Sequence, residues 1–528
     1  VFGSLMKRRI REGAKLIVLD PRRTETVDSP HCRADVHLPL RPGTNVAVLD
    51  SLAHVIVREH LFDEAFIRAR CREDEFRSWA ALVGDDRYSP EVVGPEAGLD
   101  PEAIRRAARL YAGGPNSIIY YGLGVTEHSQ GSTGVMCLGN LALACGMLGR
   151  EGVGVNPLRG QGNVQGGSCL GSWPHMFSGY RFVTDPDVRG SFEREWGIEL
   201  DPEPGLRLPN MFDAALTGAF KGMYIQGEDP VQSDPNRAHI VEALKRMECV
   251  IVQDLYLTET ARYAHVFLPG SSALEKDGTF TNAERRVSRV RKVVEPLAGL
   301  ADWQITLRLM NAMGYACHYD HPSEILDEIA RTSPAYRGMS YALIDRLGSV
   351  QWPCDENAPE GTEVLHTRTF PRGKANFMLT AFVPTRERVN DRFPLLLTTG
   401  RILSQYNVGT QTRRTGNTVW YSEDLLEIHP QDAVARNIRD GDAVTVASRI
   451  GSTTLKARLS ERVNPGVVYT TFHFAQSKAN AITTDLSDWA TNCPEYKVTA
   501  VEVTRVAQPS PAMASQPEPA ATALEAQP

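Results

Sequence analysis

The sequence predicts an α/β protein in which two related parallel-sheet domains precede a C-terminal β-barrel. Three observations predict this fold class. Short apolar runs alternate with helical patterns over most of the chain, which is typical of parallel sheets flanked by helices. A strand that ends in Asp and continues into Thr-Glu-Thr occurs twice. After about residue 390, short strand-like runs separated by Gly, Asn and Pro replace this alternation and indicate a compact β-barrel.

The parallel-sheet elements are predicted from apolar runs and capping residues. Residues 15–20 (KLIVLD) form a buried parallel strand, and residues 45–60 are apolar at helical spacing. Asp100, Pro101 and Glu102 supply an N-cap, a first-turn Pro and an acidic first turn for a helix that ends near Ala112. The remaining elements are a strand over 117–122 with a glycine-rich turn after it, and a βαβ unit of 223–227, 236–247 and 249–254.

The barrel and the domain boundaries follow from the later part of the chain. Barrel strands are predicted at 394–399, 443–448, 453–458 and 467–472. The final 22 residues are rich in Pro and Ala and cannot pack a core, so a disordered tail is expected. The predicted domains are an α/β domain over 1–158, a second α/β domain over 159–385, a β-barrel over 386–506 and a tail over 507–528.

Bulk composition limits the classes of protein to which the chain can belong. With 528 residues, 42% hydrophobic and 23% charged, it is ordinary for a globular protein of several domains. A net charge of -7 disfavours a nucleic-acid or anionic-membrane partner, and no run approaches the ~18 apolar residues of a membrane span. Nine scattered cysteines without a CxxC pair indicate reduced thiols in a cytoplasmic protein. A helical pattern is present by Leu5, so the chain is expected to begin inside a fold, and the missing signal peptide says nothing about export.

The repeated unit bears on ligand binding. Asp20 closes IVLD and precedes Thr24-Glu25-Thr26, while Asp254 closes IVQD and precedes Thr258-Glu259-Thr260, at a constant offset of 234 residues. Each unit continues into a second short strand that contains Leu-Pro. An Asp at the carboxyl end of a parallel strand is where doubly wound sheets bind ribose hydroxyls, so two nucleotide moieties are expected, one in each half. The alternative is chance similarity between two ordinary strand–turn–helix units.

The motifs around these units resemble those of one family. A Walker A sequence and a clean GxGxxG are both missing, so a cofactor that carries two dinucleotides fits better than ATP or NAD. The family-wide motifs are LDPRRTETV (19–27), LPLRPGTN (38–45), YGLGVTEHSQG (121–131), QGEDP (226–230), VQDLYLTETA (252–261), EKDGTFTNAERR (275–286), TTGRILSQYN (398–407) and CPEYKV (493–498). On these motifs, residues 1 to about 505 resemble the bis-molybdopterin guanine dinucleotide oxidoreductases.

One segment narrows the resemblance to the catalytic (alpha) subunit of molybdenum or tungsten formate dehydrogenases. The segment is GVNPLRGQGNVQG at 154–166, in which the family implies that Arg159 lies beside the metal and holds formate. The chemistry agrees, because formate is a small planar carboxylate and a guanidinium is a fixed two-pronged donor. The alternative is a loop Arg that ties down a helix end. Gly162 replaces the first Asn of the family's usual RGQNNVQG, which puts a secondary contact in doubt.

The resemblance also implies a cofactor, a reaction and partners. The cofactor is bis-molybdopterin guanine dinucleotide with Mo or W, at which formate is oxidised reversibly to CO2. Electrons then leave through iron–sulfur and flavin partner subunits, with NAD as the expected acceptor. The Cys or selenocysteine that binds the metal, its neighbouring His and the nearest [4Fe-4S] cluster are expected upstream of Val1. No metal ligand is therefore assigned here, and the 528 residues alone are expected to be inactive.

Cofactor contacts are carried over from the motifs, as the resemblance implies. The two strand-end Asp residues are expected to meet guanosine donors, and the others phosphate, ribose, guanine edges or the pterin arms. For each residue the alternative is an ordinary solvated loop. The predicted set is Asp20, Arg22, Thr24, Gly43, Thr44, Asn45, Gly122, Leu123, Gly124, Gln161, Gly227, Glu228, Asp229, Asp254, Thr258, Gly278, Thr399, Gly400, Arg401, Gln405, Tyr406, Tyr496 and Lys497.

Several features leave alternatives open. Cys169 could replace the metal-binding cysteine, but a packed thiol is the simpler interpretation. His128 and His175 are interpreted as structural residues. The basic run 285–292 is expected to neutralise cofactor phosphates or to form a solvated face. The competing functions are a nitrate reductase or another member of the superfamily, and a structural electron-transfer subunit like the degenerate relative in respiratory complex I. The NPLRGQ context argues against the first, and two intact nucleotide motifs argue against the second.

Overall fold

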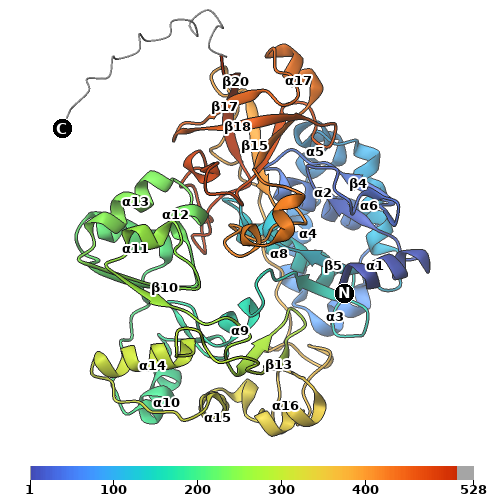
Figure 1. The fold of residues 1–528 in the computed structure, drawn as a ribbon. Helices are drawn as coiled ribbons and strands as arrows, with labels where there is room; N and C mark the ends of the chain where they lie inside the picture. The colour runs from blue at the N-terminus through green and yellow to red at the C-terminus, as the bar shows by residue number, and fades with distance from the viewer. Residues whose placement is uncertain (1, 508–528) are drawn as a thin grey trace, which may run out of the picture.

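The computed structural model describes residues 2–507, and the predicted tail lies outside the described residues from 508 onward. Separate groups of buried apolar side chains form four packing units. In Figure 1 these units surround a common centre, with the barrel at the top, the N-terminal unit on the right and the two middle units on the left and at the bottom. None of the helices among residues 2–507 is long and apolar enough to cross a bilayer.

The N-terminal unit is built on α2, whose side chains are buried over most of its length. Val48 and Ile56 are fully buried between the surrounding helices. Asp100 caps its helix by accepting a hydrogen bond from the Glu102 N–H at 3.2 Å, as predicted. The elements are α1 Phe2–Arg11, β1 Ile17–Leu19, β2 Asp28–Ser29, β3 Cys32–Arg33, β4 Val36–Leu38, α2 Asn45–Arg58, α3 Glu64–Arg70, α4 Glu73–Val83, α5 Pro90–Ala97, α6 Pro101–Ala112, β5 Ile118–Tyr121, α7 Leu123–Thr126, α8 Gly131–Ala144 and β6 Gly154–Pro157.

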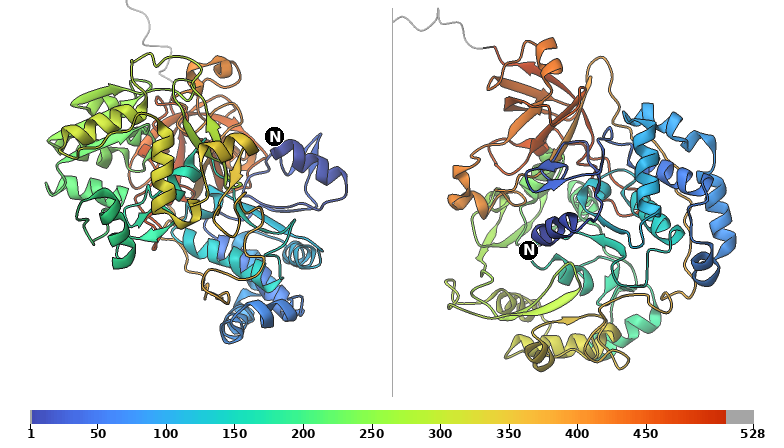
Figure 2. Two further views of the ribbon diagram at one scale, coloured as in Figure 1. Left: turned by 90° about the horizontal axis from the view of Figure 1, so that it is seen from below. Right: turned by 90° about the vertical axis from the view of Figure 1, so that its right-hand side faces the viewer.

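Two parallel strand pairs give this unit its α/β character. β1 pairs with β4 and β5 pairs with β6, both in parallel. The segment predicted as a glycine-rich turn after β5 is instead the one-turn helix α7, with Gly122 at its N-terminus. Ala375 and Phe377 join the core of this unit although they lie far along the chain. Figure 2 shows α1 projecting from the unit, and none of its described side chains is buried.

The middle of the chain forms two units with different cores. The first is a three-stranded parallel sheet in the order β11-β10-β9, and β9, α13 and β10 confirm the predicted βαβ unit. The second surrounds the antiparallel sheet β12-β13-β14 and buries Val287, Leu326 and Ile344. The elements are α9 Val164–Cys169, β7 Met176–Phe177, β8 Arg181–Phe182, α10 Pro186–Trp196, α11 Leu208–Leu216, β9 Gly222–Gln226, α12 Pro230–Ser233, α13 Arg237–Arg246, β10 Cys249–Asp254, β11 Val266–Pro269, β12 Gly278–Thr281, β13 Arg286–Val290, α14 Asp302–Ala312, α15 Pro322–Thr332, α16 Tyr341–Leu347 and β14 Val350–Gln351.

The C-terminal unit is the predicted β-barrel, closed in the order β15-β19-β16-β18-β17-β20. β15 pairs in parallel with β19 and antiparallel with β20, which closes the barrel without a free edge. Its interior is apolar and includes Leu397, Leu426 and Val468, all fully buried. The elements are β15 Leu395–Gly400, β16 Leu425–Ile428, α17 Pro430–Ala435, β17 Ala443–Ala447, β18 Ser452–Leu459, β19 Val467–Thr471 and β20 Thr499–Arg505.

The sequence repeat is also a structural repeat. β1 pairs in parallel with β4, and β10 pairs in parallel with β11. Asp20 accepts a hydrogen bond from the N–H two residues later at 2.8 Å, and Asp254 accepts the equivalent bond from Tyr256 at 3.3 Å. The two halves of the chain therefore end corresponding strands with the same local turn, which chance similarity of sequence alone does not require. The domain boundaries drawn from the sequence stay predictions.

Candidate active site

Residues that follow the parallel strands contact the barrel unit: Arg22, after β1, donates to Glu427 of β16 at 2.6 Å, and Gln232, in α12 after β9, donates to the Phe472 carbonyl at 3.2 Å. Burial raises the pKa of Asp20 at the end of β1, while the Arg22 N–H and the charges of His37, Arg22 and Lys497 oppose the rise. Lys497 belongs to the segment before β20, so the barrel brings a cation towards the strand end of the first unit. The predicted contacts Asp20 and Lys497, 477 positions apart in the chain, thus share one electrostatic environment.

A buried ion pair fixes this junction. The Lys497 side chain is nearly buried, and its ammonium group lies 2.9 Å from the Glu127 carboxylate and donates to the Thr399 carbonyl at 2.9 Å. The Thr399 hydroxyl in turn donates to the Tyr496 carbonyl at 2.9 Å. These bonds join α7, the end of β15 and the segment before β20. The predicted residues Thr399, Tyr496 and Lys497 are therefore brought together.

The turn after β5 is held by a second polar group. Asn45 Nδ2 and the His128 ring both reach the Gly124 carbonyl, at 2.8 and 2.9 Å. Burial lowers the pKa of His128 to about 4, so the ring is neutral, and its Nδ1 has no partner among the described residues. His128 thus has a structural bond that fixes the turn, in line with its structural interpretation.

Three acidic residues follow strand β9, and they differ in burial. Asp229 is buried and accepts hydrogen bonds from the Thr260 N–H at 2.8 Å and the Thr260 hydroxyl at 2.5 Å, so it holds the turn that contains Thr258. Glu228 is exposed, yet burial of its surroundings raises the pKa of its carboxyl. Burial and the charges of Glu228 and Asp229 raise the pKa of nearby Asp234 to about 7.

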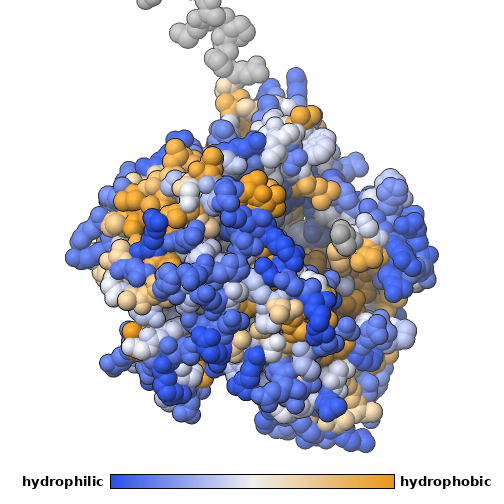
Figure 3. Space-filling view, turned by 60° about the horizontal axis from the view of Figure 1, so that its bottom comes forward, coloured by the Kyte–Doolittle hydropathy of each residue, from blue (hydrophilic) through white to orange (hydrophobic). Residues whose placement is uncertain are grey.

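Three predicted glycines present open backbone to their surroundings. A Cβ added at Gly124, Gly227 or Gly278 would meet nothing within 4 Å. Gly227 also has φ +66, a conformation that glycine adopts without strain. The space-filling view shows that the molecule is hollowed on one face, with polar and apolar residues mixed around the hollow (Figure 3). The backbone at Gly227, after the end of β9, at Gly124 in α7 and at Gly278, the first residue of β12, can therefore be approached closely by a flat ligand.

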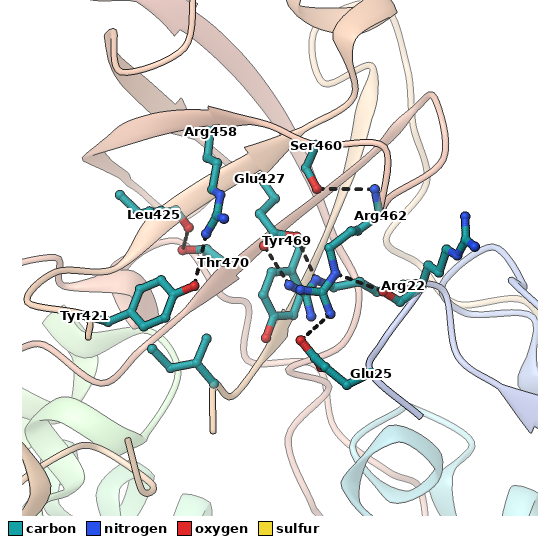
Figure 4. Close-up of polar contacts among 12 residues, drawn as sticks. Arg22, Glu25, Tyr421, Leu425, Glu427, Arg458, Ser460, Arg462, Tyr469 and Thr470 are labelled. Carbon is teal, nitrogen blue, oxygen red and sulfur yellow. Dashed lines mark hydrogen bonds and ion pairs between the residues drawn. The ribbon is translucent and has the colours of Figure 1, made fainter. Parts of the chain in front are cut away.

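Arg22 is engaged by the barrel. Its guanidinium donates two hydrogen bonds of 2.6 Å to the Glu427 carboxylate and lies 4.5 Å from the centre of the Tyr469 ring. Figure 4 shows this pair beside a second contact across the same junction, in which Arg462 donates to Glu25 at 2.8 Å. Both partners of the Arg22–Glu427 pair are buried. In this structure the side chain of Arg22 joins two units, and its predicted contact with a cofactor stays a prediction.

The other predicted barrel residues lie around the loop after β15. Gly400 is needed for packing, because an added Cβ would lie 2.6 Å from the Tyr469 ring. Arg401 lies over the Phe472 ring at 5.0 Å, and Gln405 accepts from the Thr412 hydroxyl at 2.6 Å. Tyr406 is 44% exposed, and its hydroxyl would lie 3.8 Å from a Cβ added at Gly160. This loop therefore reaches the segment that contains Arg159.

The remaining predicted residues occupy turns of the first two units. Thr44 is buried and donates to the Arg41 carbonyl at 2.7 Å. The Thr24 carbonyl accepts from the Val27 N–H at 3.0 Å, and Gly43 has φ +92. Leu123 and Gln161 are exposed, and Gly122 precedes α7. The contacts of these residues with a cofactor stay predictions.

Arg159 lies directly beyond the carboxyl end of a parallel strand. β6 ends at Pro157, and the Leu158 N–H donates to the Tyr121 carbonyl at 2.7 Å, which extends the pairing with β5. The Arg159 side chain is exposed, and its Nε donates to Gln165 Oε1 at 3.0 Å. No carboxylate pairs with Arg159 among residues 2–507. Its two Nη groups are consequently available to an anion.

Cys169 and the basic run have plain structural contacts. Cys169 is 1% exposed, and its sulfur accepts a hydrogen bond from Gln165 Nε2 at 3.0 Å, which is the environment of a packed thiol. In the basic run, Arg289 and Arg291 pair with Asp345 at 2.8 and 2.7 Å. His175 packs between aromatic rings, and burial and Arg207 lower its pKa.

Sequence reasoning missed the partners that fix the predicted residues. Glu427 holds Arg22 across 405 positions of the chain, Glu127 pairs with Lys497, and Gln165 holds Arg159. The first two are tertiary contacts between units, for which a single sequence carries no signal. Gln165 lies six residues after Arg159 in the same segment. The sequence therefore shows that the two residues are close in the chain, but not that their side chains are hydrogen-bonded.

Comparison with protein-family models gives two matches. Residues 1–312 match the model described as molybdopterin oxidoreductase. Residues 395–500 match the molybdopterin dinucleotide binding domain, a range that covers most of the closed barrel.

Curated relatives cover nearly the whole chain. It is 40% identical over 501 residues to the F420-dependent formate dehydrogenase subunit alpha of Methanocaldococcus jannaschii, covering 94% of this chain and 73% of the relative. It is 37% identical to formate dehydrogenase H of Escherichia coli, covering 94% of this chain and 70% of the relative. It is also 32% identical to the assimilatory nitrate reductase catalytic subunit of Bacillus subtilis, covering 93% of this chain and 70% of the relative.

A solved structure matches the fold. Acetylene hydratase from Pelobacter acetylenicus superposes with a TM-score of 0.72, covering 95% of this chain and 75% of that chain. The sequence identity is 18%, so this likeness concerns the fold alone.

Proposed function

We propose a function within the molybdopterin oxidoreductase family, to which this chain belongs: the chain is the catalytic subunit of a formate dehydrogenase that oxidises formate reversibly to CO2. The site would hold a molybdenum or tungsten centre between two molybdopterin guanine dinucleotides. Two observations support the pair of arms, namely the structural repeat that ends β1 and β10 in equivalent Asp turns and the open backbone at Gly124 and Gly227.

The chain's own residues would bind and orient the cofactor and the substrate. Asp20 and Asp254 offer carboxylate oxygens to hydroxyl or amino donors of the nucleotide arms. The bound cofactor supplies the centre that takes up the electron pair of the formate C–H bond. The overall change is balanced when formate yields CO2, one proton and two electrons. Arg159 would grip the two formate oxygens and so aim the C–H bond.

The observation that carries the proposal is the state of Arg159. It is an exposed guanidinium at the carboxyl end of β6, with its Nε satisfied by Gln165 and no carboxylate partner among the described residues. A cation that has no internal counter-ion can bind an anionic substrate without first breaking an ion pair. The barrel loop with Tyr406 reaches the same segment, so the Arg lies beside the residues predicted to cover the cofactor.

A nitrate reductase is the alternative within the family, because the relative from Bacillus subtilis is named an assimilatory nitrate reductase. Nitrate is also a planar anion, so Arg159 by itself does not separate the two. The NPLRGQ segment favours formate. Formate-dependent and nitrate-dependent turnover of the same holoenzyme, measured with a dye as electron acceptor or donor, would distinguish them.

Electron transfer completes the proposal. We infer that electrons pass through a [4Fe-4S] cluster to iron–sulfur and flavin partners in the cytoplasm, with NAD as the final acceptor. Because two relatives are named F420-dependent, F420 is the second acceptor to assay. The prediction that the 528 residues alone are inactive also remains, and formate-dependent dye reduction by the purified chain would contradict it.

The test is Arg159→Lys in the holoenzyme. Lys keeps the charge and loses the planar fork, so kcat/KM for formate should fall roughly 10²–10⁴-fold, or ~3–5.5 kcal/mol of transition-state stabilisation. Metal and guanine-nucleotide content should stay near the wild-type values. Unchanged kcat/KM at full cofactor content would make Arg159 a structural loop residue and would remove this support for the substrate.

A further inference from the structure

We propose that Gln165 is the positioning residue for Arg159 and that it selects the edge of the guanidinium to which the substrate anion binds. The inference rests on the proposed function and adds a residue that the sequence did not single out. Gln165 lies in α9, six positions after Arg159, and is 6% exposed. Its Oε1 accepts a hydrogen bond from Arg159 Nε at 3.0 Å.

The Gln165 amide is also hydrogen-bonded on the side away from Arg159. Its Nε2 donates to the Cys169 sulfur at 3.0 Å and to the Tyr180 hydroxyl at 3.1 Å. An amide nitrogen has two hydrogens, and each has an acceptor here. If the amide rotated by 180°, its NH2 group would face the Arg159 guanidinium, donor against donor. Tyr180 and Cys169 could also donate to a carbonyl, so the Arg159 Nε–H selects the orientation of the amide, and Cys169 and Tyr180 hold the amide in place.

The backbone supports this arrangement at a conformational cost. Tyr180 has φ +59, a left-handed conformation that a residue with a side chain rarely adopts. The preceding Gly179 has φ +77, and its N–H donates to the Cys169 carbonyl at 2.7 Å. The Tyr180 ring lies 6.1 Å from the Trp352 ring. The unusual turn thus carries the phenol hydroxyl to the amide and the thiol of the neighbouring helix.

The segment between the two residues is anchored as well. Asn163 Oδ1 accepts a hydrogen bond from the Thr281 N–H of β12 at 2.8 Å. The ring of Phe280 would lie 3.6 Å from a Cβ added at Gly162. Arg159 therefore stands on a loop that is held at the end of β6, at β12 and at α9. Gln165 supplies the hydrogen bond that reaches the guanidinium itself.

The consequence concerns how an anion can bind. A guanidinium offers a carboxylate two kinds of bidentate edge, one that includes Nε and one made by the two Nη groups. The Nε hydrogen is used by Gln165, so only the Nη1–Nη2 edge remains for a two-oxygen anion. Formate would then lie in line with the long axis of the Arg159 side chain. The direction of its C–H bond is set by Gln165 through Arg159.

The test compares Gln165→Leu with Gln232→Leu in the holoenzyme. Gln232 is a matched control, because it is also buried and its Oε1 accepts from an arginine, Arg413, at 3.0 Å. Gln165→Leu should raise the KM for formate and the dissociation constant of nitrate on the oxidised enzyme about 10- to 100-fold, the loss of one hydrogen bond to a charged group. Nitrate binding is measured by calorimetry. Gln232→Leu should lower the melting temperature and leave both constants unchanged per bound metal.

A second pair of variants covers the case in which Gln165→Leu does not fold. Tyr180→Phe and Cys169→Ala each remove one acceptor of the Gln165 amide and should raise the same two constants by smaller factors, about 2- to 10-fold. Unchanged constants in Tyr180→Phe, Cys169→Ala and any folded Gln165→Leu protein overturn the inference. If those constants are unchanged while the wild type oxidises formate and Arg159→Lys lowers kcat/KM as proposed, only the role of Gln165 fails. If the wild type does not oxidise formate at all, the proposed function fails.

Discussion

Asp50 provides a stability prediction whose size can be worked from the structure. It is 1% exposed in the middle of α2, and burial raises the pKa of its carboxyl to about 7. The Thr380 hydroxyl donates to Oδ1 at 2.8 Å, whereas Oδ2 has no partner among the described residues. At the position of this unpaired oxygen, a protonated carboxyl or a neutral amide costs less free energy than a buried negative charge. Asp50→Asn should therefore keep the packing and remove the ionisation.

The sign and magnitude follow from proton linkage. The folded-state pKa is above the unfolded value, so the stabilising contribution is present below about pH 4 and is lost as the pH rises to about 7. A shift from 3.8 to about 7 corresponds to ~4 kcal/mol at 1.36 kcal/mol per pKa unit. The Asn variant should thus gain up to ~4 kcal/mol on the wild type between pH 4 and pH 8.

Amide hydrogen exchange of α2 is the assay, because it reports the local free energy of opening in a protein of several units. The difference between variant and wild type is compared at each pH, so intrinsic exchange rates cancel. Asp74→Asn, at an exposed position of α4, is the control for the same chemical change. If the difference for Asp50→Asn stays constant from pH 4 to pH 8, the carboxyl does not titrate in this range and the reasoning is wrong.

Three further predictions concern the junctions and the site. Arg22→Met should destabilise the protein by ~3–5 kcal/mol because it leaves the buried Glu427 unpaired, and Arg22→Met/Glu427→Leu should recover most of the loss in melting temperature. Asp20→Ala and Asp254→Ala should each lower guanine-nucleotide content, since each removes a charged acceptor that contributes ~1.5–3 kcal/mol, and full content in both would contradict the two-arm assignment. The pKa of His128 is lowered to about 4, so the wild type should lose stability relative to His128→Gln as the pH falls from 6.5 to 4, by up to ~3 kcal/mol in denaturant titrations.

Elements with a local cause were predictable from the sequence. The cap at Asp100, the βαβ unit through β10 and four of the six barrel strands (β15, β17, β18 and β19) were predicted, because side-chain periodicity and capping act over a few residues, whereas β16 and β20 were missed. The repeat was predictable for the same reason, since its Asp turns are made by residues two positions apart. The helix α7 was missed because Gly122 and Gly124 indicate a turn, whereas the bonds of Asn45 and His128 to the Gly124 carbonyl hold that segment.

The junctions between units could not be predicted, because their partners are far apart in the chain. Arg22 was expected at a ligand from its motif alone, and nothing near it in the sequence points to Glu427. Phe377 likewise joins the core of the N-terminal unit after more than two hundred intervening residues. A single sequence records which side chains are polar or apolar, and only the packed structure decides which of them meet.

The distribution of counter-ions among the site's cations is what separates structural from ligand-binding roles. Arg22 and Lys497 both belong to motifs predicted to contact a cofactor, and both are already paired with a nearly buried carboxylate. An incoming anion would have to displace that carboxylate, and the displaced acid would then remain buried without a partner, which is costly. Arg159 is held instead by a neutral amide oxygen. An amide fixes the direction of the guanidinium without neutralising it, so the full charge remains for the substrate. A carboxylate at position 165 would orient Arg159 equally well and would compete with formate, which gives a physical reason for Gln, rather than Glu, behind the arginine.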